Sequence, residues 1–512
     1  MTQQELIQAV VPVDKLNSLS KEELIEFFKL EQSYRKKLQG EVERLQALNE
    51  ELKQKHFYIE EHYIVIKNKF YGKSSEKSVH VRENESGGAH KKSKKKKVQL
   101  PSQRYPDAPL IEREVIIKDE PDCSCCGAKM QDSGMTEDSE FLTVIPQQYL
   151  IIRQKRHKYK CGKCYGAVIT APVPPRMKEG SAYSDEMMVD VALSKYCDLV
   201  PIDRYSQMAG REGLKDLPPQ SLIETTHYLA DFTQEAYDKL KTEITESKVL
   251  HADETPHRML EGNDTSNWYL WGFSTPKTSY FECHDTRSGE VASSILTNSH
   301  CQYLISDVFS GYAKAVKDAN KVRDEEKKQK IVNVYCNAHA RRKFKEAEER
   351  FPEEAEFFIE QYRQIYHLES LARAGPLKEV LDFRKQMLPY YEAMKNKAMA
   401  DYGGYSSKSS LGKAFTYFLR NYNELTLFIK NTDLPIDNNS QERLLRSPVI
   451  GRKTWYGTHS KRGAQTAAIL FSLVESCKLN KINPRKYFQK LIETLHQRKP
   501  AFTPAQFNKL PA

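Results

Sequence analysis

Hydrophobic residues recur at a spacing of seven near the beginning of the chain. One row consists of Leu38, Leu45, Leu52, Ile59 and Ile66, and the positions between them hold Val42, Asn49, His56 and Tyr63. This repeat is typical of a coiled coil, in which an Asn in the seam favours a two-stranded register. The two aromatic seam residues weaken the second half of the repeat. The pattern predicts that residues 1–70 form a helical dimerisation segment, with a long helix packed on its own chain as the alternative.

The apolar pattern stops after Phe70. Residues 71–118 contain few apolar side chains, so they cannot bury a core and are predicted to form a flexible basic linker. Six of the seven residues 91–97 are lysine, and Lys94, Lys95, Lys96 and Lys97 are consecutive. Such a run suits contacts with DNA phosphates, although a solvated linker has the same composition.

Helical spacing of apolar residues returns between residues 179 and 247, with Pro and Gly only at the breaks. Two of these helices flank Gly213 and the segment LKDLPPQ, and the second begins near Ser221. This pair is a candidate helix-turn-helix for binding DNA, although any helical pair with a short turn gives the same pattern.

From Lys248 the pattern changes to that of strands rich in aromatic and β-branched residues. Three strands, VLHADETP, NWYLWGFSTP and TSYFECHDTR, precede the helix GEVASSILTN and the strands CQYLISDVF and KIVNVYC. The predicted order is therefore βββαβ, a helix and a further strand. Residues from Phe351 to about Lys430 have little strand character, which predicts an all-helical segment.

The composition of the 512 residues is that of a polar globular protein with several domains, since 39% are hydrophobic and the mean hydropathy is -0.68. No apolar run approaches about 18 residues, and no basic leader precedes an apolar block, so we expect neither a membrane span nor secretion. The net charge of +10 favours polyanionic partners. The ten cysteines show no disulfide spacing, which indicates a reducing compartment.

Two cysteine pairs have the spacing of a structural zinc site. Cys123 and Cys126 form one Cys-x-x-Cys turn, and Cys161 and Cys164 form another. Zn²⁺ prefers four soft ligands in a tetrahedron, so two such turns close a site without an open position for catalysis. The pattern predicts a zinc ribbon-like module. Cys125 is an alternative ligand within the first turn, and a redox dithiol pair is the main alternative to zinc.

Three acids are candidate ligands for catalytic metal ions. Asp253 and Asp307 each follow an apolar strand, and Glu442 lies on a helix whose start is signalled by DNNS. Hard cations take oxygen ligands, and two Mg²⁺ or Mn²⁺ ions held by clustered carboxylates can catalyse phosphoryl transfer. A single acid is usually a surface charge. The placement of these acids in the βββαβ order is what supports a shared site.

Four basic residues, Arg443, Arg446, Arg452 and Lys453, surround or follow Glu442 and are candidates for DNA phosphate contacts. Arg446 can instead pair with Glu442 one helical turn away. Other residues have structural explanations. An isolated Cys-x-x-His pair, Cys336 and His339, more often packs than binds metal, and the tryptophans Trp268 and Trp271 more often belong to a core.

Several motifs together resemble the insertion-sequence sixty-six family of bacterial DDE transposases. They are HADETP at 251–256, SDVFSGY at 306–312, CNAHARRKF at 336–344 and DNNSQERLLRSPVIGRK at 437–453, joined by FYGKSSEK at 70–77 and KYCDLVPIDRY at 195–205. The resemblance covers nearly the whole chain. It implies a ribonuclease-H-like catalytic core with a mixed sheet, interrupted by a helical insertion. It also selects Asp253, Asp307 and Glu442 over the neighbouring Asp437, and departs from the family at Val308 and Phe309, where Gly-Tyr is common.

The expected fold class is multi-domain α+β. The segments are residues 1–70 (coiled coil), 71–118 (linker), 119–178 (zinc module), 179–247 (helical DNA-binding domain), 248–348 (first part of the catalytic core), 349–432 (helical insertion), 433–476 (second part of the core, with the acidic helix) and 477–512 (C-terminal tail).

The expected function is that of a DNA transposase, which cleaves at element ends and transfers the 3′-OH to target DNA with Mg²⁺ or Mn²⁺ at the acids and a structural Zn²⁺ elsewhere. Expected partners are the terminal inverted repeats, target DNA, a second copy of the chain and element-encoded accessory proteins, in the bacterial cytoplasm at the nucleoid. The alternative is a zinc-containing DNA-binding regulatory protein with an inactive nuclease-like core.

Overall fold

The computed structural model describes the chain in ranges separated by gaps. The described residues are 20–22, 25, 28–29, 32–33, 35–49, 100–106, 108–112, 121–122, 124–130, 139–144, 147–161, 168–260, 267–326 and 328–509. Residues 35–49 are helical, as the heptad pattern predicts. The remaining heptad positions from Leu52 onward lie outside the described residues. The short helix α4 (Pro101–Arg104) and the antiparallel strands β1 (Lys158–Lys160) and β2 (Val168–Thr170) precede the larger folded part.

A five-stranded mixed sheet is the framework of that part. Its strands are β3 (Val249–Arg258), β4 (Asn267–Ser274), β5 (Ser279–His284), β6 (Tyr303–Ser306) and β7 (Val332–Tyr335). They lie in the order β5-β4-β3-β6-β7. The first three strands pair antiparallel, and β6 and β7 run parallel to β3. With α9 (Glu290–Thr297) and α10 (Ser310–Glu325) between the later strands, the predicted order of elements is confirmed.

Helices that precede the sheet in the sequence and helices that follow it both contribute to its core. They are α5 (Asp185–Tyr196), α6 (Ile202–Arg211), α7 (Pro219–Phe232) and α8 (Gln234–Glu246) before the sheet, and α17 (Asn439–Trp455), α18 (Lys461–Leu479), α19 (Pro484–His496) and α20 (Pro504–Phe507) after it. Leu193, Leu240 and Leu491 from these helices pack in one cluster with Leu250 and Leu304 of the sheet. The helices before the sheet and the C-terminal segment therefore share one core with the strands.

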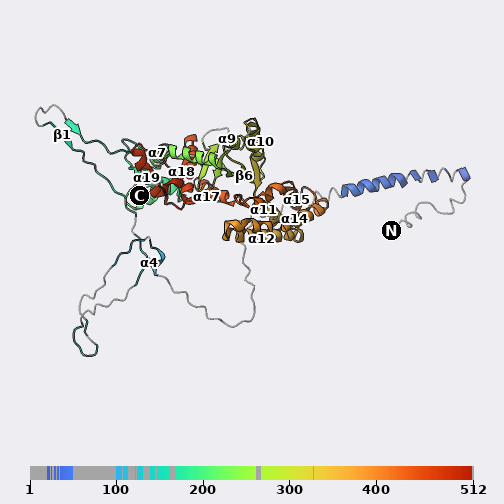
Figure 1. Ribbon diagram of the computed structural model, residues 1–512, viewed down its shortest axis with the longest axis horizontal. Coiled ribbons are helices and arrows are strands. Elements are labelled where there is room, and N and C mark those ends of the chain that lie inside the picture. The colour runs from blue at the N-terminus through green and yellow to red at the C-terminus, as the bar shows by residue number, and fades with distance from the viewer. Residues whose placement is uncertain are drawn as a thin grey trace.

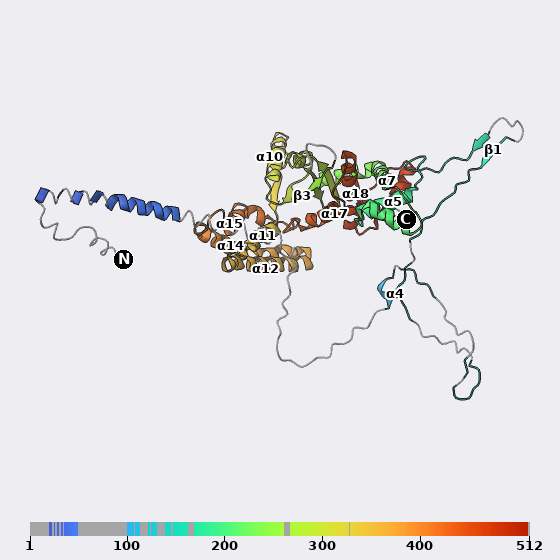
Figure 2. The same ribbon diagram turned by 180° about the vertical axis from the view of Figure 1, so that it is seen from behind.

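A second cluster of helices is formed by α11 and the insertion. It contains α11 (Asn337–Glu348), α12 (Pro352–Ala374), α13 (Val380–Lys385), α14 (Leu388–Asp401), α15 (Ser410–Arg420) and α16 (Tyr422–Thr426), with short 3₁₀ turns at Leu377–Glu379, Tyr402–Gly404 and Leu427–Lys430. No strand occurs among residues 351–430, all of which the structure describes, as predicted. Figures 1 and 2 show α11, α12, α14 and α15 gathered at one end, and α17 leading from them toward α18.

Alternate residues of the central strands β3 and β6 pack in different clusters. Side chains alternate between faces along a strand. Leu250 and Leu304 pack in the cluster that includes residues of α9 and α10, whereas their neighbours Val249 and Ile305 pack against the insertion. Since Asp253 lies four residues after Val249, its side chain belongs to the face toward the insertion.

Candidate active site

The two predicted aspartates lie side by side at one edge of the sheet. The parallel register pairs Val249 with Tyr303 and His251 with Ile305. Continued by two residues, the same register sets Asp253 opposite Asp307. Oδ1 of Asp307 accepts a hydrogen bond of 3.2 Å from the backbone N–H of Phe309, in the turn that leads into α10.

The third acid approaches these aspartates on α17, whose start is fixed by Asn438. The buried Asn438 side chain donates to the carbonyl of Ala252 at 2.9 Å, and its Oδ1 is 2.7 Å from Nδ1 of His251. Its backbone N–H also donates to Sγ of Cys336 at 3.1 Å. The DNNS motif does begin the helix, but the Asn438 side chain binds β3 rather than capping the helix. Glu442, one turn later, is thereby held beside the strand that carries Asp253.

The helix comes close to the sheet because β4 has a glycine opposite Asp253. The antiparallel register pairs Asp253 with Gly272. A Cβ atom at Gly272 would lie 2.2 Å from Nε2 of Gln441 and 2.8 Å from Cε1 of Phe281. The fully buried Gln441 immediately precedes Glu442, so this close approach sets the height of the acid above the sheet.

The three acids interact electrostatically. Burial, followed by the charges of Glu254, Asp307 and Glu442, raises the pKa of Asp253 from 3.8 to about 8. Burial and the Glu254 charge also raise the pKa of Asp307, while the nearby His339 opposes this rise. Negative charges at this edge are therefore only partly neutralised by the protein, and protonation or a cation stabilises the cluster.

Comparison with known proteins identifies the family. A model of the Transposase IS66 family matches residues 180–466, and a model of the zinc-finger binding domain of transposase IS66 matches residues 120–165. The chain belongs to the IS66 transposase family. The resemblance found in the sequence motifs is confirmed, and the family is one of DDE transposases.

The chain is also similar to proteins of Sinorhizobium fredii (strain NBRC 101917 / NGR234). "Uncharacterized protein y4hP" is 24% identical over 401 residues, which cover 74% of this chain and 71% of the relative. "Uncharacterized protein y4jD" is 25% identical over 398 residues, which cover 75% of this chain and 76% of the relative. The likeness thus extends well beyond the motifs around the acids.

The DDE transposase family implies a divalent cation, and the three acids are residues that fit one. The donors are carboxylate oxygens, which Mg²⁺ and Mn²⁺ prefer, and their mutual repulsion is what a cation neutralises. A softer site is less suited. Ligand atoms of Cys336, His339 and Glu442 all lie within 4.8 Å of one another. Burial, however, raises the pKa of the Cys336 thiol to about 12, and its sulfur accepts the backbone N–H of Asn438.

Two residues that stabilise the edge of the sheet near the acids, Glu254 and Arg287, were not singled out from the sequence. Glu254 points to the opposite face from Asp253, where it binds Arg287 at 2.7 Å and accepts the Tyr312 hydroxyl at 2.5 Å. The Arg287 guanidinium also lies 4.2 Å from the centre of the Phe309 ring, at the position where the chain departs from the family pattern. The Asp-Glu doublet was the only sequence signal for this arrangement.

Glu442 is contacted from α11. Nδ1 of His339 is 3.6 Å from Oε1 of Glu442, and Nη2 of Arg342 is 3.9 Å from Oε2. The predicted alternative, in which Arg446 pairs with Glu442, does not occur among the described residues. The histidine of CNAHARRKF thus lies at the acid cluster, although from the sequence packing was the favoured explanation of the Cys-x-x-His pair.

The predicted basic residues divide into three groups. Arg443 and Arg446 are exposed and line a pocket with Glu442. Arg452 donates to the Pro256 carbonyl, and Lys453 is exposed. The run Lys94, Lys95, Lys96 and Lys97 lies outside the described residues.

The predicted zinc ligands are only partly described. Cys126 and Cys161 are exposed, whereas Cys123 and Cys164 lie outside the described residues. All four positions fall within the match to the family's zinc-finger domain, which supports zinc. Trp271 is fully buried and its Nε1 donates to the Thr286 carbonyl, so its predicted place in the core is confirmed. In the parts of the chain that the structure describes, no helix combines the length and apolar character needed to cross a membrane.

Proposed function

We propose that this chain cuts DNA at the ends of a mobile element and joins the freed 3′-OH to target DNA, with Asp253, Asp307 and Glu442 as the metal ligands. The observation that supports this proposal is the approach of β3, β6 and α17, which brings three carboxylates to one edge of a mixed sheet. The arrangement is that expected of a ribonuclease-H-like core. Surface acids without a shared role have no reason to interact in this way.

Both reactions are in-line displacements at phosphorus. In the first, a water oxygen attacks the phosphodiester at the element end, the P–O3′ bond breaks and a 3′-OH is released. In the second, this 3′-OH attacks a target phosphodiester and the target's own 3′-oxygen leaves. Two bound Mg²⁺ ions would activate the attacking oxygen and stabilise the leaving oxygen. The acids would hold the ions, Asn438 orients the acidic helix, and Glu254 with Arg287 supports β3 from the opposite face.

The other modules are proposed to position DNA. The zinc-finger region, the lysine run at residues 94–97 and the pair α6–α7 are candidates for binding the terminal repeats. The coiled coil would join two copies so that two ends are handled together. Of the helical pair, α7 packs against both α5 and α18 and buries Leu222 and Leu229, so only its outer face is open to DNA.

The test is Mn²⁺ binding to zinc-loaded protein, with and without end DNA, in parallel with a cleavage assay. Asp253→Asn, Asp307→Asn and Glu442→Gln should each weaken Mn²⁺ binding by at least about tenfold, the size typical even of changes in outer-shell groups. Each should abolish cleavage while DNA binding is kept. Asp437→Asn, the neighbouring acid, is the matched control and should keep Mn²⁺ binding. If none of the three substitutions changes Mn²⁺ binding, the result would favour the DNA-binding regulatory alternative.

A further inference from the structure

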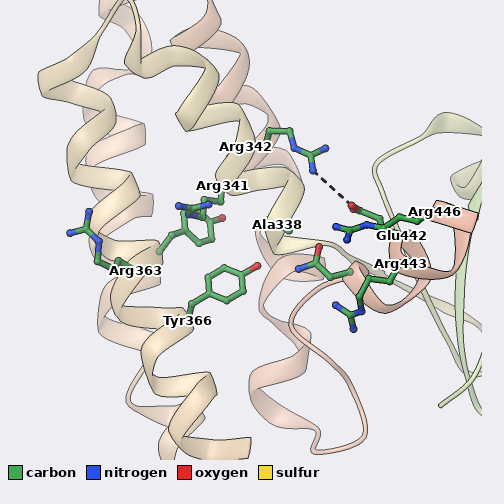
Figure 3. Close-up of a pocket in the computed structure, with 10 residues that line it drawn as sticks. Ala338, Arg341, Arg342, Arg363, Tyr366, Glu442, Arg443 and Arg446 are labelled. Carbon is green, nitrogen blue, oxygen red and sulfur yellow. Dashed lines mark ion pairs between the residues drawn. The ribbon is translucent and has the colours of Figure 1, made fainter. Parts of the chain in front are cut away.

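A pocket of about 490 Å³ lies beside Glu442, between α11, α12 and α17. Figure 3 shows α12 on one side and α17 on the other, with Arg342 of α11 directed toward Glu442. We call it the arginine pocket, because arginines from all three helices line it. They are Arg341, Arg342, Arg363, Arg443 and Arg446. Only Arg443 and Arg446 were singled out by the sequence.

The charge of the arginine pocket is poorly balanced. Arg342 contacts Glu442, and Arg363 pairs with Glu356 and Glu360 on its own helix. Across the described ranges, no ion pair engages Arg341, Arg443 or Arg446. Like charges brought together repel one another, so this arrangement is stabilised by an anionic ligand. Arginines that served only solubility would not need to converge from three helices.

The chemistry of the pocket favours phosphate. A guanidinium group presents parallel N–H donors that match two phosphate oxygens, and it remains charged at any physiological pH. Among the residues that line the pocket, Glu442 is the one acid, and its charge also acts on Asp253. A strand whose phosphates are held by the arginines therefore passes next to Glu442.

We propose that the arginine pocket binds the backbone phosphates adjacent to the scissile phosphodiester, and that α12 of the helical insertion forms one wall of the DNA site. The inference rests on the proposed function, because it assigns the neighbouring acids to cleavage. Contacts to phosphates position a strand without reading its bases. The pocket is therefore expected to act alike on every sequence, and recognition of the element ends belongs to other modules.

The experiment compares two double variants of the full chain. Arg341→Gln with Arg446→Gln removes two pocket charges, and Arg420→Gln with Lys430→Gln removes two exposed charges elsewhere in the insertion. The probe is a duplex carrying the element's terminal repeat, bound in Ca²⁺, with single neutral methylphosphonate linkages placed around the cleavage position.

In the unmodified chain, a neutral linkage next to the scissile bond should weaken binding about tenfold, and the control variant should keep that penalty. The pocket variant should bind the ordinary duplex at least about tenfold more weakly and lose the penalty at those linkages. Its plot of log affinity against log salt should be shallower by about 1.8, because each phosphate contact contributes about 0.9. Arg341→Lys with Arg446→Lys, which keeps the charge, should restore the salt slope and shows that loss of folding is not the cause.

The inference would be overturned if the neutral linkages weakened DNA binding by the pocket variant as much as they weaken binding by the unmodified chain. The inference would also be overturned if the pocket binds free anions and not DNA. In that case inorganic phosphate would raise the melting temperature of the unmodified chain but not of the pocket variant, and the methylphosphonate pattern would be the same in both. Mn²⁺ titration of the same proteins separates the two proposals. If the acids do not bind Mn²⁺ but the arginine-dependent pattern is present, the proposed cleavage function fails and the phosphate site stands.

Discussion

At Asp253 the proposed role as a metal ligand opposes the stability of the folded chain. In the absence of a cation its pKa is raised to about 8, mainly by burial and then by the neighbouring carboxylates. The folded chain therefore binds this proton more tightly than the unfolded chain, whose aspartate has a pKa of about 3.9. Its contribution to stability is fully present below about pH 4 and is lost as the pH rises to about 8.

Asp253→Asn removes the ionisable group, so the variant should gain stability over the unmodified chain as the pH rises from 4 to 8. The difference in the free energy of unfolding should grow by at most about 1.4 kcal/mol per pH unit and level off above pH 8. Denaturation of zinc-loaded protein in buffers without Mg²⁺ measures it, with the exposed Asp433→Asn as the control. A stability gap that stays constant with pH would refute the raised pKa. Added Mn²⁺ should stabilise only the unmodified chain and the control.

Asn438 acts through position rather than chemistry. Its side chain connects α17 to β3 through the Ala252 carbonyl and His251. Asn438→Ala should lower stability by about 1–3 kcal/mol, because buried partners lose their hydrogen bonds. It should also weaken Mn²⁺ binding by about 10–100-fold, because Glu442 is no longer held beside Asp253.

The control for that change is Asn480→Ala. Like Asn438, Asn480 makes two side-chain hydrogen bonds, in its case as donor to the carbonyls of Lys277 and Ser476, but it lies at the end of α18. This variant should lose stability without losing Mn²⁺ affinity, as measured by calorimetry. If both variants bind Mn²⁺ as tightly as the unmodified chain, the position of Glu442 does not depend on Asn438.

The residues that could be predicted from the sequence are those whose role is indicated by the residues next to them in the chain. Asp253 and Asp307 follow apolar strands, so their shared edge could be anticipated before any register was known. The role of Asn438 could not, since its partners His251 and Ala252 lie nearly two hundred residues earlier. The same holds for Arg363, whose place in the pocket that Glu442 lines depends on how α12 packs.

At the scale of elements, the approach of α17 to the sheet depends on the absence of a side chain at Gly272. An added methyl group there meets Gln441 and Phe281, both fully buried. Gly272→Ala should therefore cost about 1–3 kcal/mol of stability, the usual size of overpacking. It should also lower Mn²⁺ affinity, because α17 must move away from Asp253. Chemical denaturation and Mn²⁺ titration measure the two effects.

Gly210→Ala is the matched control for this substitution. Gly210 lies inside α6 with no atom within 4 Å of an added Cβ, so the change should be neutral or stabilising by about 0.4–1 kcal/mol. If Gly272→Ala were equally harmless, the sheet and α17 would have room to spare, and the close approach would not set the position of Glu442.

The order of elements was predictable because strand and helix patterns are local, but their packing was not. The pattern around Gly213 indicates two helices, and α6 and α7 are present. Residues 212–218 connect them, and α7 begins at Pro219 rather than near Ser221. The burial of Leu222 against Val191 and of Leu229 in the main core depends on α5 and the sheet, so the open face of α7 emerges only from the assembled fold.

At the scale of the whole molecule, segments that look separate in sequence share cores. Residues 179–247 and 477–512 were expected to be a domain and a tail, yet Leu240 and Phe488 belong to the same cluster as the sheet. The insertion has its own core, which extends to Ile305 and Val334 of the strands. Composition is enough to predict the linker at residues 71–118, because a lack of apolar residues can be recognised within the segment itself. It cannot reveal that two folded segments bury the same core.

The exposed heptad residues of the N-terminal helix predict that the chain forms a dimer. In the single chain, Leu38, Val42 and Leu45 are 52%, 46% and 56% exposed, although they form the predicted seam. Such a seam is stabilised when a second copy covers it. The unmodified chain should therefore be a dimer by sedimentation equilibrium, and Leu45→Asp should weaken dimerisation by at least about tenfold, since it buries an unpaired charge. Ala47→Asp places the same charge two residues away, outside the seam, and should leave the dimer intact. A monomeric unmodified chain, or equal effects of both substitutions, would show that the heptad residues do not hold two copies together.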